Sequence, residues 1–322
     1  MEYKLSIIVP IFNSEKFLER TLKSILYQIT EEVELVLIND GSTDSSENIV
    51  FKYINNYSNI KYYYQENRGV ATARNKGIQI SNGKYIFFCD SDDILLDGAI
   101  EIILKNIAYE NDIIMFSHKE NGDKDIHYIK PNFKTYLIDE TLINEFFFDS
   151  KFAVVLWDKV LKKEIICKNN LSFELTTLED FYFLFKFFRN SESILYVPKS
   201  IYKYYIRIDS YSKTFREDYI KNLMFVYKEM KDFIELNSKR KVVLNSNIDH
   251  WYKRNLKNIL YVMMISDKKS FKQKKKLYLN YFTDSDTQFL ISYLFFINNF
   301  SASFASDDFC EVLQSKVQIH QQ

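Results

Sequence analysis

Three aspartates stand within four residues at the end of a short apolar run, in YIFFCDSDD, and they are Asp90, Asp92 and Asp93. Carboxylates at this spacing repel one another, so the cluster needs compensation from water, a helix N-terminus or a cation. A helix N-terminus stabilises one carboxylate well, whereas three exceed its partial charge. A hard divalent cation resolves the repulsion, and Mg²⁺ or Mn²⁺ suits aspartates that leave most ligand positions to water and phosphate. A solvated capping cluster is the alternative interpretation.

Other polar loops follow earlier apolar runs. The first run continues into PIFNSE, and the second into NDGSTDSS, where Asp40 supplies an acceptor before a glycine. The plain interpretation of the second loop is a strand-to-helix turn with a capping residue. A further segment, ENRGVATARNKG, places Arg68, Arg74 and Lys76 near a predicted helix start. Cations and free amides there favour an anionic ligand such as a diphosphate, and a solvated helix face is the alternative.

The runs that carry these loops are predicted to be buried strands. Five runs are rich in Val, Ile and aromatic residues, which is typical of strands covered on both faces: LSIIV, VELVLI, IKYYY, YIFFC and IIMF. Between them lie four segments with apolar residues at helical spacing: SEKFLERTLKSILYQ, SSENIVFKYINNY, VATARNKGIQI and DGAIEIILKNIAYE. The alternation predicts an α/β fold with a mostly parallel central sheet flanked by helices, and ligands in such folds bind at the carboxyl ends of the strands.

Beyond about residue 120 the alternation stops, and all six glycines lie at or before Gly122. We expect helices and ordinary loops in the remainder, with helices across much of 145–166 and 178–192 and from Tyr219 onward. A boundary is placed between residues 211 and 217.

Composition excludes several classes of protein. The 43 basic and 43 acidic residues cancel, which argues against a general nucleic-acid binder. Three scattered cysteines without a CxxC pair indicate neither a disulfide framework nor a zinc site and suit a reducing, cytoplasmic setting. The short apolar run after MEYK is interrupted by Pro10, so we expect no signal peptide. No GxGxxG follows the first strand and no GxxxxGK[ST] occurs, which removes support for dinucleotide-binding and P-loop enzymes.

Two C-terminal segments have unusual charge patterns. Residues 253–276 carry nine Lys or Arg against one acid, which suits peripheral contact with an anionic membrane; a solvated face is the alternative. Residues 287–306 carry no charge but contain Gln, Asn and several serines. We interpret this stretch as a buried helix or a homo-oligomer contact rather than a membrane span.

The loops, in this order and spacing, resemble the inverting family 2 glycosyltransferases of the GT-A fold. The matching stretches lie within residues 5–95: SIIVPIFNSEKFLERTLKSILYQ, VELVLINDGSTDSSENIV and NRGVATARNKGIQISNGKYIFFCDSDDIL. Three later stretches resemble the bacterial capsule, lipooligosaccharide and teichoic-acid branches of that family: LWDKVLKKEII, TLEDFYF and YKYYIRIDSYS. The resemblance implies a GT-A domain over 1–215, with the nucleotide sugar bound by 1–120 and the acceptor by 121–215. A helical region over 216–322 follows.

The resemblance also implies roles for individual residues. Asp40 would accept from a uracil N–H, Asp90 would hold the ribose, and Asp92 would coordinate the Mn²⁺ or Mg²⁺ that bridges the two phosphates. The implied donor-binding residues are Pro10, Ile11, Phe12, Asp40, Arg74, Asp90, Ser91, Arg207, Ser210 and Ser212. The last three match a loop that closes onto the diphosphate in related enzymes, and a tyrosine is common where Phe12 stands.

Asp180 matches the general base of the family, and Glu179, Trp157 and Asp158 would lie near the acceptor. An acceptor hydroxyl is a poor nucleophile at its normal pKa, so a carboxylate base must lie within hydrogen-bond reach. One base and in-line attack predict inversion. The alternative for the Glu-Asp pair is an ordinary helix N-terminus capped by Thr176 or Thr177. The alternative for Trp157 is a core aromatic residue.

The leading hypothesis is a metal-dependent inverting transferase that moves a hexose or N-acetylhexosamine from a UDP-sugar to a hydroxyl of a bacterial surface glycan. The acceptor would be an oligosaccharide, a lipid-linked glycan or a polymer, reached from the cytoplasm or the inner face of the plasma membrane. A nucleotidyltransferase is a rival, but it would carry a Gly- and Arg-rich loop after the first strand, which PIFNSE lacks. A nucleotide-sugar-binding subunit without its own catalysis is the other rival.

Overall fold

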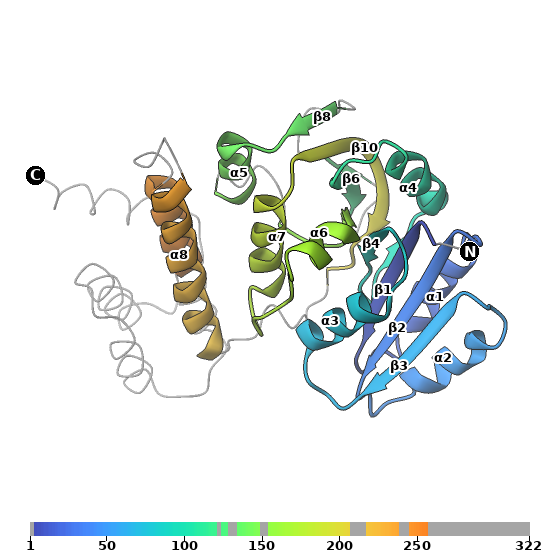
Figure 1. The fold of residues 1–322 in the computed structure, drawn as a ribbon. Helices are drawn as coiled ribbons and strands as arrows, with labels where there is room; N and C mark the ends of the chain where they lie inside the picture. The colour runs from blue at the N-terminus through green and yellow to red at the C-terminus, as the bar shows by residue number, and fades with distance from the viewer. Residues whose placement is uncertain are drawn as a thin grey trace, which may run out of the picture. The chain divides into compact units, whose positions relative to one another are not determined.

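The computed structural model describes residues 3–120, 124–127, 134–148, 154–206, 217–237 and 245–256. Its strands are β1 (Leu5–Ile11), β2 (Val33–Asp40), β3 (Ile60–Gln65), β4 (Tyr85–Phe88), β5 (Ile94–Leu95), β6 (Ile113–Lys119), β7 (Asp125–Ile126), β8 (Lys134–Leu137), β9 (Lys159–Lys162) and β10 (Ser193–Lys203). Its helices are α1 (Leu18–Leu26), α2 (Ser46–Ile54), α3 (Val70–Ile80), α4 (Ala99–Ile107), α5 (Glu140–Phe147), α6 (Lys163–Lys168), α7 (Glu179–Arg189) and α8 (Glu217–Asn237) (Figure 1). Residues 245–256 are also helical.

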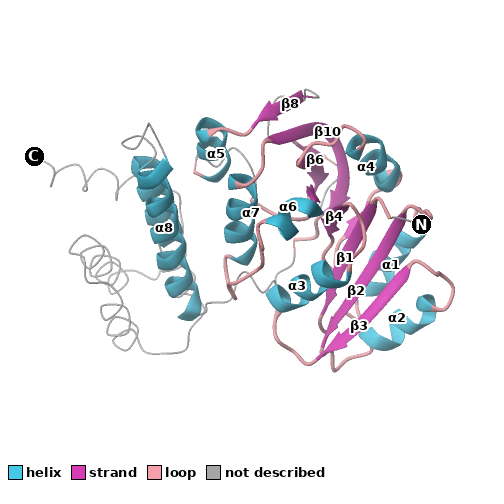
Figure 2. Ribbon diagram, in the orientation of Figure 1, coloured by secondary structure: helices cyan, strands magenta, loops and turns pink. Residues whose placement is uncertain are grey.

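The α/β fold predicted from the sequence is confirmed. All five predicted strands are present as β1, β2, β3, β4 and β6, and the four helical segments between them are α1 to α4. The central sheet runs in the order β3-β2-β1-β4-β9-β6-β10-β5, with helices on its faces (Figure 2). β1 pairs in parallel with β2 and β4, and β2 pairs in parallel with β3. The loops after β1, β2 and β4 therefore leave from the same edge of the sheet.

Opposite faces of the sheet are covered by different helices. Ile7 and Val9 of β1 belong to a core that also contains apolar residues of α1, α2 and α4. Side chains of a strand alternate between faces, so Ile8 points to the other face. α3 lies there, because a Cβ atom added to Gly77 would stand only 2.4 Å from Ile8 Cγ2. Gly77 thus allows α3 to pack closely on the sheet. This close packing sets the distance of Arg74 and Asn75 from the strands.

Four strands after residue 120 were not predicted: β7, β8, β9 and β10. Residues 159–162, interpreted as helix, form β9, which pairs antiparallel with both β4 and β6. This strand is only four residues long, and burial between two other strands outweighs the helical pattern around it. β10 was missed because Pro198 interrupts its apolar run; the register with β6 shifts between Val197 and Ser200. The expectation of helices and ordinary loops after residue 120 is therefore wrong for β7, β8, β9 and β10.

α7, which begins at the Glu-Asp pair, packs against the described C-terminal helices. The Asn222 amide donates to Thr177 Oγ1 at 2.8 Å, and the rings of Phe181 and Trp251 stack with their centroids 4.7 Å apart. Residues 1–264 form one compact unit. The predicted boundary at 211–217 lies almost wholly outside the described residues, as do most of 253–276 and all of 287–306. Among the helices that the structure describes, none has the length and apolarity to cross a bilayer.

Candidate active site

The loop after β1 is tied to the loops after β2 and β4. The Ser14 amide donates to Ser46 Oγ at 2.8 Å, and the Glu15 amide donates to Asp44 Oδ2 at 2.9 Å. The hydroxyls of Ser14 and Ser91 are 2.6 Å apart. These bonds gather the three polar loops that the sequence singled out at one edge of the sheet, as the parallel pairing of β1, β2 and β4 requires.

Asp40 is buried and anchors the loop that follows β3. Its Oδ1 accepts from Gln65 Nε2 at 2.7 Å and from the Arg68 amide at 2.9 Å, and its Oδ2 accepts from the Gly69 amide at 2.8 Å. The carboxylate therefore fixes the start of α3, a role that sequence reasoning did not assign. Its contact with a uracil N–H stays a prediction. Among the other residues expected to border a base, Pro10 and Ile11 are buried in β1, and Phe12 is 47% exposed.

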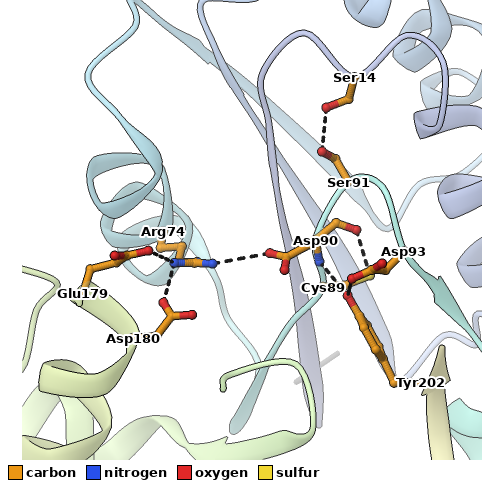
Figure 3. Close-up of polar contacts among 9 residues, drawn as sticks. All are labelled: Ser14, Arg74, Cys89, Asp90, Ser91, Asp93, Glu179, Asp180 and Tyr202. Carbon is orange, nitrogen blue, oxygen red and sulfur yellow. Dashed lines mark hydrogen bonds and ion pairs between the residues drawn. The ribbon is translucent and has the colours of Figure 1, made fainter. Parts of the chain in front are cut away.

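Arg74 joins three carboxylates that come from two distant parts of the sequence (Figure 3). Its Nη1 donates to Asp180 Oδ1 at 2.5 Å and to Glu179 Oε1 at 3.2 Å, and its Nη2 lies 3.3 Å from Asp90 Oδ1. The guanidinium is buried, and its planar fork can face several carboxylates at once. Arg74 was expected near the base or diphosphate. The structure places it between the CDSDD loop and the start of α7.

The environment of Asp180 shifts its proton affinity. Burial raises the pKa of this carboxyl to about 7, against the opposing charge of Arg74, and the negative charges of Glu179 and Asp90 add to the rise. Lys159 also lowers this pKa through its charge. About a quarter of the side chain, 26%, stays exposed, so a ligand can reach it. A carboxylate with this pKa is suited to accept a proton near neutral pH.

The first turn of α7 is built differently from an ordinary capped helix. Its N-cap residue is Leu178, which has φ 58° and makes no side-chain cap bond. Thr176 and Thr177 bond instead to residues of α8. The alternative given above for the Glu-Asp pair, a helix N-terminus capped by Thr176 or Thr177, therefore does not describe this helix start. The left-handed conformation of Leu178 is one that a branched residue rarely adopts, and it turns the chain just before the two acids.

The three aspartates of CDSDD have separate environments. Asp90 faces Arg74 and is one-third exposed, and Asp92 is partly exposed. Asp93 is buried, with its Oδ2 accepting from the Tyr202 hydroxyl and its Oδ1 from the Tyr205 amide, both at 2.8 Å. Burial and the charge of Asp90 raise the pKa of Asp93 to about 7. Repulsion within the cluster is thus relieved for two of its members by Arg74 and by Tyr202.

Tyr202 is a site residue that sequence reasoning missed. Its hydroxyl accepts from the Asp90 amide at 3.1 Å while it donates to Asp93, so one buried oxygen fixes two residues of the CDSDD loop (Figure 3). Tyr202 lies near the end of β10, inside the stretch YKYYIRIDSYS. Nothing in that stretch distinguishes this tyrosine from its neighbours until β10 is placed in the sheet.

Trp157 and Asp158 lie inside the core. Trp157 is 8% exposed and stacks on the rings of Tyr202 and Tyr204, which is the core arrangement given above as the alternative. Asp158 is completely buried, and Lys159 Nζ donates to its Oδ1 at 2.5 Å. The acceptor roles of both residues stay predictions, and contact with an acceptor would require these side chains to become exposed. Arg207, Ser210 and Ser212 lie outside the described residues.

The predicted metal ligand can be compared with its surroundings. Asp92 is partly exposed in the loop that also carries Asp90 and Asp93. In the described part of the chain, no group of three or more His, Cys, Asp or Glu side chains forms a protein-only metal site. One carboxylate fits an ion whose remaining ligands are phosphate oxygens and water.

Comparisons with known proteins agree with this architecture. Residues 6–165 match the model of glycosyl transferase family 2. The chain is 31% identical over 237 residues to the glycosyltransferase GlyA of Streptococcus pneumoniae. The aligned residues cover 70% of this chain and 34% of GlyA. It is 30% identical over 230 residues to the cholesterol galactosyltransferase of Borreliella burgdorferi, covering 66% of this chain and 63% of that protein. The chain thus spans about a third of the first relative and less than two thirds of the second.

Solved structures share the fold. S. aureus TarS 1–349 in complex with UDP-GlcNAc has a TM-score of 0.63 at 22% identity, covering 85% of this chain and 78% of that chain. The same protein in complex with UDP has a TM-score of 0.61 at 22% identity, covering 79% and 72%. The family match covers β1 to β9, including Arg74 and the CDSDD loop, and ends before Glu179 and Asp180. The chain belongs to glycosyl transferase family 2.

Proposed function

We propose that this protein transfers a hexose or N-acetylhexosamine from a UDP-sugar to a hydroxyl of a bacterial surface glycan, with inversion at the anomeric carbon. The observation that carries the proposal is the carboxylate of Asp180, held by Arg74 at the edge where the loops after β1, β2 and β4 meet, with a pKa raised to about 7 by burial. Two solved complexes support the donor class, because TarS has the same fold and is described with UDP and with UDP-GlcNAc. A family relative named as a minor teichoic acid biosynthesis protein supports the acceptor class.

Asp180 is proposed as the general base. A sugar hydroxyl gives up its proton only as the new bond forms, so the base must lie within hydrogen-bond reach of the attacking oxygen. A base whose pKa lies close to the working pH is deprotonated in a useful fraction while it still accepts the proton readily. With a single base and attack from the side opposite the diphosphate, an α-linked donor gives a β-glycoside.

The leaving diphosphate needs stabilisation of its negative charge. We propose that Asp92 holds Mg²⁺ or Mn²⁺ together with the donor phosphates; when bound, the ion would supply positive charge to the leaving group. Asp90 is proposed to hold the ribose. Arg74 keeps both Asp90 and Asp180 in place, so the donor side and the base share one cation.

Cellular contacts belong to the same proposal. The basic residues of 253–276 would rest on anionic lipid at the inner face of the plasma membrane, next to a lipid-linked acceptor. The uncharged stretch 287–306 would form a homo-oligomer contact. Sedimentation with vesicles tests the first contact, because the full chain should prefer anionic over neutral vesicles and should lose the preference in high salt.

The decisive experiment is a calorimetric screen of nucleotide sugars in the presence of Mn²⁺, since binding can be measured before the acceptor is known. We expect one or a few UDP-sugars to bind, with binding weakened by EDTA. Release of UDP from the bound donor, measured in the same samples, separates an enzyme from a binding subunit. Absence of binding to every UDP-sugar would contradict the proposed function. Binding without UDP release in the presence of any glycan acceptor would favour the non-catalytic subunit.

A further inference from the structure

Asn75, the residue after Arg74, bonds to a distant segment through both ends of its side-chain amide. Its Nδ2 donates to the Phe173 carbonyl at 2.8 Å, and its Oδ1 accepts from the Phe173 amide at 2.8 Å. This pair of bonds matches the way two residues face each other in a sheet ladder. Because one donor and one acceptor are engaged together, the backbone at Phe173 is fixed relative to α3 in position and in orientation.

Phe173 is in turn joined to α7. Its ring stacks on that of Phe183, with centroids 4.0 Å apart and an interplanar angle of 9°, and meets the edge of Phe88 at the end of β4. Phe183 lies one turn inside the helix that begins with Glu179 and Asp180. Leu178, the left-handed residue that precedes the acids, lies five positions after Phe173. The segment is therefore held at its backbone by α3 and at its ring by α7.

The neighbours Arg74 and Asn75 hold the same helix start by different means. Arg74 contacts the side chains of the two acids, whereas Asn75 holds the backbone that leads to them. The ion pairs of Arg74 alone do not fix the path of the backbone that leads into α7, because an ion pair forms over a range of positions of its two charged groups. The two bonds of Asn75 remove that freedom.

We propose that Asn75 is a positioning residue for Asp180: it sets, through Phe173, where the first turn of α7 places the base. This inference rests on the proposed function only for the identity of the base. The side chain must both donate and accept at the length of asparagine, so alanine removes both bonds and aspartate, which only accepts, keeps the bond from the Phe173 amide alone.

Turnover of Asn75→Ala gives the first test, with Asn59→Ala as the matched control. Asn59 also makes two bonds to the backbone, from its Nδ2 to the carbonyl of Thr30 at 3.1 Å and to that of Val33 at 2.7 Å, and it lies on the loop before β3. Misplacing a catalytic group by about 1 Å can cost on the order of a hundredfold in rate, so we expect kcat for UDP release to fall at least about tenfold in Asn75→Ala. The KM for the donor and the calorimetric affinity for UDP should stay within about twofold. Asn59→Ala should match the wild type in all three.

Hydrogen exchange gives a readout independent of activity. Peptides that cover residues 178–184 should exchange faster in Asn75→Ala than in Asn59→Ala, while peptides from β1 and β2 should be unchanged. Asn75→Asp should fall between the wild type and Asn75→Ala in both rate and exchange, and it serves if the alanine variant fails to fold. A kcat for Asn75→Ala within twofold of that for Asn59→Ala, or unchanged exchange at 178–184, would overturn the inference. If the wild-type protein releases UDP from no donor, the proposed function fails, and the exchange measurement still decides whether Asn75 positions this helix start.

Discussion

Replacing Arg74 by glutamine removes the cation that faces Asp90, Glu179 and Asp180 and leaves three carboxylates close together. Breaking a buried ion pair by removing one partner costs about 3–5 kcal/mol. Asp90 and Asp180 keep 33% and 26% of their side-chain surface exposed, so water screens part of the repulsion. Discounting that range for this screening, we expect a loss of about 2–3 kcal/mol in the free energy of unfolding, at or below its lower limit.

The loss of Arg74 should change both the melting temperature and the pKa of Asp180. For a unit of this size, each kcal/mol lowers the melting temperature by about 2–4 °C, so Arg74→Gln should melt about 4–12 °C below the wild type. The second effect concerns the base. The charge of Arg74 lowers the pKa of Asp180, so its removal moves that pKa upward from about 7. A positive charge at hydrogen-bond distance commonly lowers the pKa of a carboxyl by one or more units. We therefore expect the pKa of Asp180 to rise by about one unit in Arg74→Gln.

The assay is the pH dependence of UDP release from the donor identified in the calorimetric screen. Asp180 accepts a proton only when it is ionised, so the wild-type rate should rise with pH through about 7, and that of Arg74→Gln should rise at higher pH. Arg74→Lys keeps the charge but loses the planar fork, so its midpoint should lie between the two. Lys84→Met, which removes an exposed ion pair with Glu110, is the control and should leave the midpoint in place. An unchanged midpoint in Arg74→Gln would refute the assignment of Arg74 as the partner of the base.

Three further substitutions test the roles of Asp92, Tyr202 and Gly77. Asp92→Asn should abolish the metal-dependent part of UDP-sugar turnover, and full activity in that variant would remove Asp92 as the metal ligand. Tyr202→Phe keeps the ring but removes the bonds to Asp93 and to the Asp90 amide, so we expect a loss of about 1–3 kcal/mol in denaturant unfolding; an unchanged unfolding midpoint would show that the hydroxyl does not support the loop. Gly77→Ala places a methyl group against Ile8 and should destabilise the protein by about 1–3 kcal/mol, measured by the same method, whereas wild-type stability would mean that α3 can move away from the sheet.

The fold of the first third could be predicted because its signals are local. Each strand there is a short apolar run, and each helix repeats its apolar residues within one segment, so the α/β alternation needs no knowledge of distant contacts. Val70–Ile80 illustrates this: the predicted helical segment has the same limits as α3. β9 and β10 depend instead on neighbours that the sequence does not reveal. Buried pairing with β4 and β6 decides the state of Val160 and Leu161, although the surrounding residues favour a helix.

The candidate site shows the same division between local and distant information. The residue types of CDSDD predicted metal or carboxylate chemistry, whereas the Glu-Asp pair was singled out by its resemblance to a family motif. The ion pairs that these acids make with Arg74 could not be predicted from the sequence. Asp90 lies 16 positions and Asp180 lies 106 positions from Arg74 along the chain. Asn75 and Tyr202 were missed for a related reason. Each acts through a backbone group or a buried carboxylate brought close only by the fold.

We propose that Asp180 is the base of a UDP-sugar transferase. To test this role, Asp180→Asn is compared with the wild type in two assays on the same preparations: calorimetric affinity for UDP and transfer from the UDP-sugar. Asparagine keeps the shape of the side chain and cannot accept the proton, so we predict that UDP affinity stays within a few fold while transfer is lost. Transfer at the wild-type rate with intact UDP binding would contradict the account and would move the base to another residue.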